Sequence, residues 1–116
     1  MTTENGDEAM ISYQDFKKVE LKVGKVLSVE DHPNADKLLV IRVDLGEETP
    51  RTLVAGLKPY YRPEQLEGRR VVVVANLEPA QLRGVASNGM LLAAQDGETV
   101  SVLTPDADVA PGSTVL

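Results

Sequence analysis

The stretch from Val71 to Ala94 constrains the fold of this chain more than any other part of the sequence. Four consecutive valines open an apolar run, VVVVANL, which passes through a short turn, EPAQLRG, into a second run, VASNGMLLAA. Apolar β-branched runs bounded by Pro and Gly are typical of strands buried in a barrel core. The dipeptide Asn88-Gly89 is a common hairpin signal, but we place it inside the second strand. A glycine in a strand often marks the close approach of another molecule's backbone.

Length and composition limit the class of protein. A chain of 116 residues and 12.5 kDa predicts one domain with its own core. The absence of cysteine excludes disulfides, a thiolate metal site and a thiol nucleophile. No apolar run approaches the roughly 20 residues of a membrane span, and MTTENGDEAM lacks the basic and apolar regions of a signal peptide. We therefore expect a soluble cytoplasmic protein with no membrane partner.

The distribution of charge matters more than its sum. A net charge of -6 argues against nucleic-acid binding, because phosphate contacts need clustered Lys and Arg. All twelve of these cations, however, lie between Lys17 and Arg83, whereas seven of the eighteen acids lie outside residues 11–95, in the leader and the tail. The eleven acids that remain leave the central segment at +1. A modest basic face is compatible with this balance, but a strong electrostatic field is not.

The order of elements predicts the fold. Residues 1–10 form an acidic leader, and Ser12 with Asp15 has capping-box spacing for a short helix over 12–18 that turns Phe16 to the core. A domain over residues 11–116 follows, in which Gly24 marks a bulge or a bend of the barrel. Strands are expected over 19–29, 39–45, 51–57, the two runs described above, 100–103 and 113–116, with a helix over 63–68.

Three strands, a short helix and two strands are the order of an OB-fold, a five-stranded Greek-key barrel. The sequence therefore predicts an all-β OB-fold with a short helix between strands three and four and a C-terminal β extension. OB-folds bind oligonucleotides through strands two and three and the loops between strands one and two and between strands four and five. Because OB-folds also bind proteins and saccharides, the fold alone does not decide the ligand. The cations on the binding elements are Lys37, Arg42, Arg51, Lys58 and Arg83.

The residues of the predicted barrel resemble a known family, the tRNA-binding domain found at the C-terminus of many methionyl-tRNA synthetases and as a free-standing tRNA-binding protein. The resemblance covers about residues 11–116 and is carried by HPNADKL, ANL, LRGVASNGM and LTPD. It implies recognition of the outer corner of tRNA by shape, and a domain that raises the tRNA affinity of a synthetase. It also implies a homodimer formed through residues 11–18 and the strands after Val100. The expected partners are therefore tRNA, a second copy of the chain and an aminoacyl-tRNA synthetase.

Matching the family motifs onto this sequence gives the candidate RNA contacts. They are Lys37, Asn76, Arg83, Ser87 and Met90, to which we add the strand-two cation Arg42. Cations can contact phosphates, Ser87 can bond a phosphate or a ribose hydroxyl, and the Met90 thioether offers a polarizable face. Alternatives remain open: Met90 as a core residue, Ser87 and Asn76 bonding nearby backbone, and the loop cations simply solvated. With four aromatic residues in the chain, a stacking platform for single strands is disfavoured.

An enzymatic function finds little support in the sequence. The single histidine, His32, has acidic neighbours in Glu30, Asp31 and Asp36, but an ordinary loop residue is favoured there over a metal ligand. No nucleophile elbow, phosphate-binding loop or dinucleotide motif is present. We therefore expect a binding module without an active site, metal or cofactor. The alternative function is a dimeric OB-fold protein-binding module or export chaperone of the CsaA type.

Overall fold

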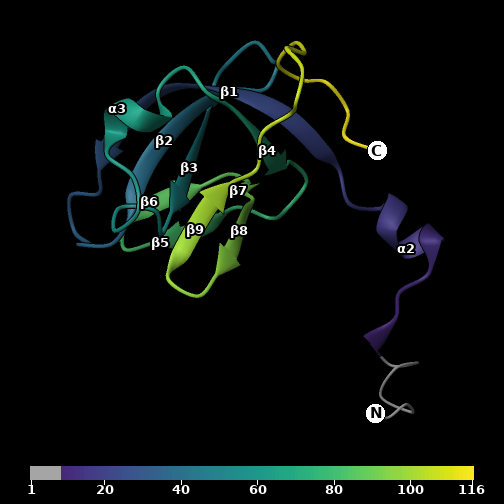
Figure 1. The fold of residues 1–116 in the computed structure, drawn as a ribbon, viewed down its shortest axis with the longest axis horizontal. Coiled ribbons are helices and arrows are strands. Elements are labelled where there is room, and N and C mark those ends of the chain that lie inside the picture. Colours follow the sequence, from purple (N-terminus) through teal and green to yellow (C-terminus); the bar gives the residue numbers. More distant parts are fainter. Residues whose placement is uncertain (1–8) are drawn as a thin grey trace.

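A five-stranded antiparallel sheet, in the order β3-β2-β1-β4-β7, forms the body of the computed structural model, which describes residues 9–116 (Figure 1). Each strand pairs with its neighbour antiparallel. This order confirms the predicted all-β barrel of the OB type. The strands are β1 (Leu21–Asp31), β2 (Leu39–Asp44), β3 (Arg51–Ala55), β4 (Arg70–Val74) and β7 (Met90–Leu91).

The long strand β1 bends the sheet, because its first half pairs with β4 and its second half pairs with β2. We predicted a bulge or a bend of the barrel at Gly24, but the register shifts between Val26 and Ser28, so the bulge lies at Leu27. Gly24 has a packing role instead, since a Cβ there would lie 2.8 Å from Cδ2 of Leu45. A glycine at that point therefore allows β1 to pass close to the end of β2.

Aliphatic side chains from alternate positions of the strands fill the barrel. Leu39, Ile41 and Val43 point inward from β2, and Val71 and Val73 do so from β4. Alternation in a strand sends every second side chain to one face, so the period-2 pattern of β2 predicts its buried face. Each fully buried aliphatic side chain contributes about 1.5–3 kcal/mol of hydrophobic stabilisation.

The short helix α3 (Pro63–Leu66) covers one end of the barrel, where Leu66 is completely buried (Figure 1). Pro63 occupies the first turn, as predicted, because its missing N–H needs no partner there. Gln65 completes the cap by accepting a hydrogen bond from the Arg62 backbone N–H at 2.7 Å.

The predicted fifth strand is wrong as a continuous element. The chain forms β6 (Val85–Ser87), breaks at Asn88-Gly89, and continues as β7 and β8 (Ala93–Asp96). The Asn88 N–H donates to the Thr52 carbonyl of β3 at 2.8 Å, and Met90 then pairs with Val74 of β4. The chain thus crosses from the edge of β3 to the edge of β4, which closes the barrel, and a straight strand could not make that crossing.

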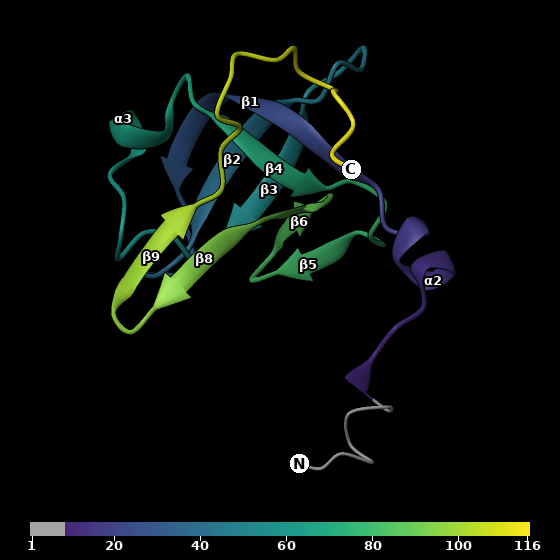
Figure 2. The ribbon, with the colours of Figure 1, turned by 45° about the vertical axis from the view of Figure 1, so that its right-hand side comes forward.

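A second hairpin lies within the segment EPAQLRG, which we predicted as a turn. Residues Ala80–Leu82 form β5, which pairs with β6 and with no other strand of the described chain (Figure 2). Arg83 and Gly84 form its two-residue turn with φ of 55° and 92°. Two successive positive φ angles are typical of a type I′ turn, which matches the twist of the strands it joins.

The C-terminal extension begins as a hairpin in which β9 (Thr99–Val102) pairs with β8. Val102 is buried against the barrel, and its N–H donates to the Tyr61 hydroxyl at 3.0 Å. The strand predicted over residues 113–116 is wrong, because only an isolated bridge joins Thr114 to Lys22. Two backbone hydrogen bonds flank that bridge, from the Val23 N–H to the Ser113 carbonyl at 2.9 Å and from the Val115 N–H to the Leu21 carbonyl at 2.8 Å.

The helix α2 (Tyr13–Lys17) projects from the barrel at the start of β1 (Figure 2). The Ser12 hydroxyl caps it by accepting from the Asp15 N–H at 3.0 Å, as predicted. Phe16 does not reach the core, contrary to the prediction. Its side chain is 40% exposed, and α2 has no buried residue. Of the predicted leader, residues 1–8 lie outside the described residues. No helix in the described part of the chain is long and apolar enough to cross a membrane.

Candidate nucleic-acid interface

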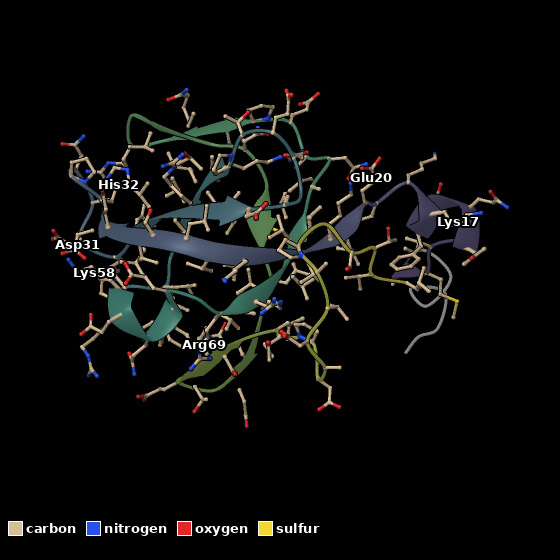
Figure 3. All side chains as sticks on the ribbon, turned by 90° about the horizontal axis from the view of Figure 1, so that it is seen from above. Lys17, Glu20, Asp31, His32, Lys58 and Arg69 are labelled. Atoms are coloured by element: carbon tan, nitrogen blue, oxygen red, sulfur yellow. The ribbon has the colours of Figure 1, made fainter. Side chains whose placement is uncertain are left out.

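Lys37 and Arg83 lie on two loops that are hydrogen-bonded to each other. Lys37 belongs to the loop between β1 and β2, and Arg83 lies at the tip of the β5–β6 hairpin. His32 Nε2 lies 2.8 Å from the Leu82 carbonyl oxygen, and Asn34 Nδ2 donates to the Arg83 carbonyl at 3.4 Å. The end of the molecule that holds His32 is opposite to α2 and Lys17 (Figure 3). The two predicted contacts therefore share one end of the barrel.

Arg42 lies on the outer face of the sheet that continues from these loops. It is exposed on β2, opposite Thr52 of β3, and its neighbours Ile41 and Val43 point into the core. Val54 is two positions beyond Thr52 and shares its outward direction. The outer face of β2 and β3 therefore carries a cation beside the β5–β6 hairpin.

A shallow groove of about 240 Å³ lies between β3 and the β5–β6 hairpin. Met90 contributes to its wall and is 47% exposed, which argues against the alternative that Met90 is a core residue. The remaining walls are mostly aliphatic, with Glu78 at the end that follows β4. The aliphatic side chains that line it with Met90 are Val54, Leu77, Ala80 and Leu82.

Ser87 lies at the floor of this groove, and its hydroxyl is already bonded within the chain. It is 5% exposed, accepts from the Val54 N–H at 2.9 Å, and donates its one hydrogen to the Gly89 carbonyl at 3.1 Å. The hydroxyl thus satisfies a buried donor at the edge of β3, where no strand of residues 9–116 pairs with Val54 on that side. Its contact with RNA stays a prediction, and its demonstrable role is to hold β6 against β3.

Asn76 follows β4, and its side-chain amide joins two distant segments. Its Oδ1 accepts from the Glu20 N–H at 2.9 Å, and its Nδ2 donates to the Lys18 carbonyl at 2.6 Å. Asn76 therefore bonds the junction between α2 and β1 rather than its own turn. Asn76 remains exposed beside the junction between α2 and β1, and its contact with RNA stays a prediction.

The other two cations on the binding elements form ion pairs. Arg51 binds Glu47 through two hydrogen bonds of 2.9 and 2.8 Å, and Lys58 lies 3.1 Å from Asp31 (Figure 3). The hydrogen bonds from Arg51 lower the pKa of Glu47 from its ordinary value of 4.5. Arg51 also donates to the carbonyl oxygens of Ala75 and Asn88, so it braces the closure of the barrel.

Within residues 9–116, by contrast, Lys37, Arg42 and Arg83 form no ion pair. Their charges remain available for phosphate contacts, which depend on cations not already neutralised. Within the described residues, the cations of the site that form no ion pair therefore number three rather than the five expected from the elements.

The sequence reasoning missed His32 and the aliphatic walls of the groove. The sequence predicts an ordinary loop residue at His32, but both of its ring nitrogens make hydrogen bonds and its side chain is buried. No local pattern could predict this, since the partner of Nε2 is 50 residues away in the sequence. The groove walls were missed because the β5–β6 hairpin was expected to be a turn.

Comparison with protein families gives a match over most of the barrel. The model described as "Putative tRNA binding domain" matches residues 21–114. Among curated proteins, the chain is 61% identical over 110 residues to the methionine–tRNA ligase of Pyrococcus abyssi and 59% identical over 112 residues to that of Pyrococcus furiosus. Each match covers 95% of this chain but 15% of the ligase. The chain therefore spans about one seventh of these relatives.

Solved structures support the same relationship over nearly complete chains. A methionyl-tRNA-synthetase-related protein from Pyrococcus horikoshii has a TM-score of 0.86 at 34% identity, covering 92% of this chain and 98% of its own. The chaperone CsaA of Bacillus anthracis has a TM-score of 0.83 at 27% identity, covering 93% of this chain and all of its own. A synthetase-related protein and a CsaA chaperone therefore both share this fold.

Proposed function

We propose a function from the premise that this chain belongs to the tRNA-binding domain family. In this proposal, the chain binds folded tRNA on the face formed by β2, β3, the β1–β2 loop and the β5–β6 hairpin. The observation that carries this assignment of the face is the placement of Lys37, Arg42 and Arg83. All three are exposed cations, free of ion pairs in the described chain. Lys37 and Arg83 lie on the two linked loops, and Arg42 lies on β2, which pairs with the strand that borders the groove lined by Met90. Cations so placed can follow a phosphate backbone, and the groove can receive a sugar or base edge.

The proposed role is that of an accessory binding module. The matching region makes up 15% of the ligase of Pyrococcus abyssi, so a domain of this kind occurs there beside a much larger remainder. We infer that this chain raises the tRNA affinity of a synthetase, to which it is either joined or bound. The proposal assigns it no reaction, cofactor or metal of its own, and places it in the cytoplasm, where tRNA is charged.

The proposal includes a homodimer. Apolar side chains of α2 and the C-terminal segment surround a cavity of about 270 Å³, among them Phe16, Val19 and Val115. Met10, Ile11 and Tyr13 extend this exposed apolar surface along the N-terminal segment. Contiguous apolar surface on a small domain favours association, and a second copy could bury it across a two-fold axis. This surface lies at the end of β1 opposite His32, so dimerisation leaves the proposed RNA face open (Figure 3).

The test is a gel shift of bulk folded tRNA and of unstructured poly-U at several salt concentrations. Three unpaired cations predict a slope of log affinity against log salt of about -2 to -3, at about -0.7 to -0.9 per phosphate contact. We expect tRNA to bind more tightly than poly-U. A slope near zero, or equal affinity for the two RNAs, would contradict recognition of folded tRNA.

The alternative function is a peptide-binding chaperone, which the aliphatic groove and the likeness to CsaA favour. A carboxymethylated, permanently unfolded polypeptide serves as the probe. If this polypeptide binds and protects against aggregation while tRNA fails to shift, the chaperone function replaces the proposed one. If tRNA competes the polypeptide away, both ligands use the same groove.

A further inference from the structure

His32 lies between the two loops of the proposed RNA face, with both ring nitrogens engaged. Nδ1 accepts a hydrogen bond from the Asn34 backbone N–H at 2.9 Å, and Nε2 lies 2.8 Å from the Leu82 carbonyl oxygen. A backbone N–H can only donate and a carbonyl can only accept. Nδ1 must therefore be unprotonated and Nε2 must carry the hydrogen, so the two partners determine the tautomer. The ring is 5% exposed, which keeps water from competing for these bonds.

Asn34 provides a second connection between the same two loops. Its side-chain Nδ2 donates to the Arg83 carbonyl at 3.4 Å, one residue beyond the carbonyl that His32 binds. We call this pair of contacts, from His32 to Leu82 and from Asn34 to Arg83, the loop–hairpin link. It holds the backbone on both sides of the Leu82–Arg83 bond.

The hairpin needs such a link because little else holds its tip. Strands β5 and β6 form a separate two-stranded sheet, and all three residues of β5 are exposed. An isolated two-stranded hairpin is marginally stable in water. Its base is held to β3 through Ser87 and Asn88, whereas the hydrogen bonds from its tip to the rest of the described chain are those of the loop–hairpin link.

We propose that His32 is a positioning residue for RNA binding: it holds the tip of the β5–β6 hairpin against the β1–β2 loop and so sets the position of Arg83 relative to Lys37. This inference rests on the proposed function, because it assigns His32 an effect on tRNA affinity. His32 itself touches no RNA, since its ring is buried. Two cations held at one spacing can match two phosphates without first ordering a mobile loop, which preserves affinity.

A double-mutant cycle tests this coupling. The variants are His32→Ala, Arg83→Ala and the combination, each measured for tRNA affinity under one salt condition. We expect Arg83→Ala to weaken binding about five- to thirtyfold, which corresponds to about 1–2 kcal/mol. His32→Ala should weaken it by a similar factor in the presence of Arg83 and by less than about twofold in its absence, because coupled residues are not additive.

Two further variants separate positioning from general stability. Val102→Ala removes a buried side chain in β9, away from the two loops, and should lower stability without changing the affinity of the folded protein. Asn34→Ala removes the exposed half of the loop–hairpin link and leaves the core intact, so it remains informative if His32→Ala fails to fold. It should weaken tRNA binding about two- to threefold, and only when Arg83 is present.

Amide hydrogen exchange gives a readout that needs no RNA. Removal of His32 should speed exchange of the amides in residues 80–87 and leave that of β1 and β4 unchanged. Unchanged exchange in the hairpin, or losses of affinity from His32→Ala and Arg83→Ala that simply multiply, would overturn the inference. If the unaltered protein fails to bind tRNA, the proposed function falls with the RNA role of His32, and the exchange data still decide whether the loop–hairpin link exists.

Discussion

Arg83 combines an exposed cationic side chain with a left-handed backbone, at φ of 55° in the hairpin turn. Replacement by alanine keeps a Cβ in the same conformation, so the strain of the turn is unchanged. We expect Arg83→Ala to weaken tRNA binding by about 1–2 kcal/mol and to reduce the salt slope by about one unit. The control is Arg69→Ala, an exposed cation over the Tyr61 ring on another side of the barrel (Figure 3). An equal effect of both variants would mean that Arg83 has no specific place in the site.

Replacement of Met90 tests whether the groove, rather than the cations, contributes to tRNA affinity. Because its side chain is about half exposed, Met90→Ala should cost under about 0.5 kcal/mol of folding stability, in contrast to the roughly 2–5 kcal/mol of a buried methionine. We expect weaker tRNA binding with an unchanged salt slope, since a thioether neutralises no phosphate. Thermal unfolding and binding at two salt concentrations measure both effects. A large loss of stability with full affinity in the folded fraction would remove Met90 from the site.

The ion pair between Glu47 and Arg51 should make the folding stability depend slightly on pH. Its folded pKa lies below its ordinary value of 4.5 because Arg51 bonds the charged carboxylate. The stabilisation is therefore fully present above pH 4.5 and is lost as the pH falls through the lowered folded pKa. The pair is partly exposed, so Glu47→Gln should cost under about 1 kcal/mol at pH 7. Urea unfolding of both proteins should give stabilities that converge at low pH; a constant difference would contradict this cause.

At the scale of elements, the break between β6 and β7 determines how the barrel closes. Gly89 has φ of 126°, and a Cβ there would lie 3.1 Å from both Leu53 Cδ2 and the Val74 carbonyl oxygen. A glycine at this position predicted the approach of another molecule's backbone, but its close neighbours belong to the barrel's own strands. The same crossing carries Ser87 and Met90 to one groove, so the closure of the barrel and the proposed binding groove depend on one short segment.

Gly89→Ala should therefore destabilise the fold by about 1–3 kcal/mol, from backbone strain together with contact with Leu53. Gly97→Ala is the matched control, because Gly97 also has a positive φ, of 60°, but has open space around its Cβ position. We expect the control to cost less than Gly89→Ala in urea unfolding. If the two variants lose equal stability, the packing argument for Gly89 is wrong and conformation alone explains the glycine.

For the whole molecule, the apolar surface of α2 and the C-terminal segment predicts self-association. Light scattering at micromolar concentration should give about twice the 12.5 kDa of one chain. Phe16→Asp should give a monomer of unchanged stability, since α2 has no buried residue and a charge would oppose burial in an interface. A monomeric mass for the unaltered chain, or a dimer that survives Phe16→Asp, would contradict this location of the interface.

The barrel strands and α3 could be predicted from the sequence because their signals are local. Alternating apolar residues in β2, the valine run of β4 and the proline at the start of α3 each determine an element through its own hydrophobic period or dihedral restriction. The family motifs then predicted which face to expect for RNA. The element order led to the OB-type barrel, which the sheet topology confirmed.

What only the tertiary structure decided are the contacts between segments far apart in the chain. The use of Asn88-Gly89 as a crossing depends on where the edges of β3 and β4 come to lie, and a hairpin such as β5–β6 is too short to show a clear period. Likewise, Arg51 and Lys58 look available for RNA in the sequence, but folding brings each to a carboxylate. His32 is the plainest example: an isolated loop histidine in the sequence joins two loops because the barrel places a carbonyl 50 residues away beside its ring.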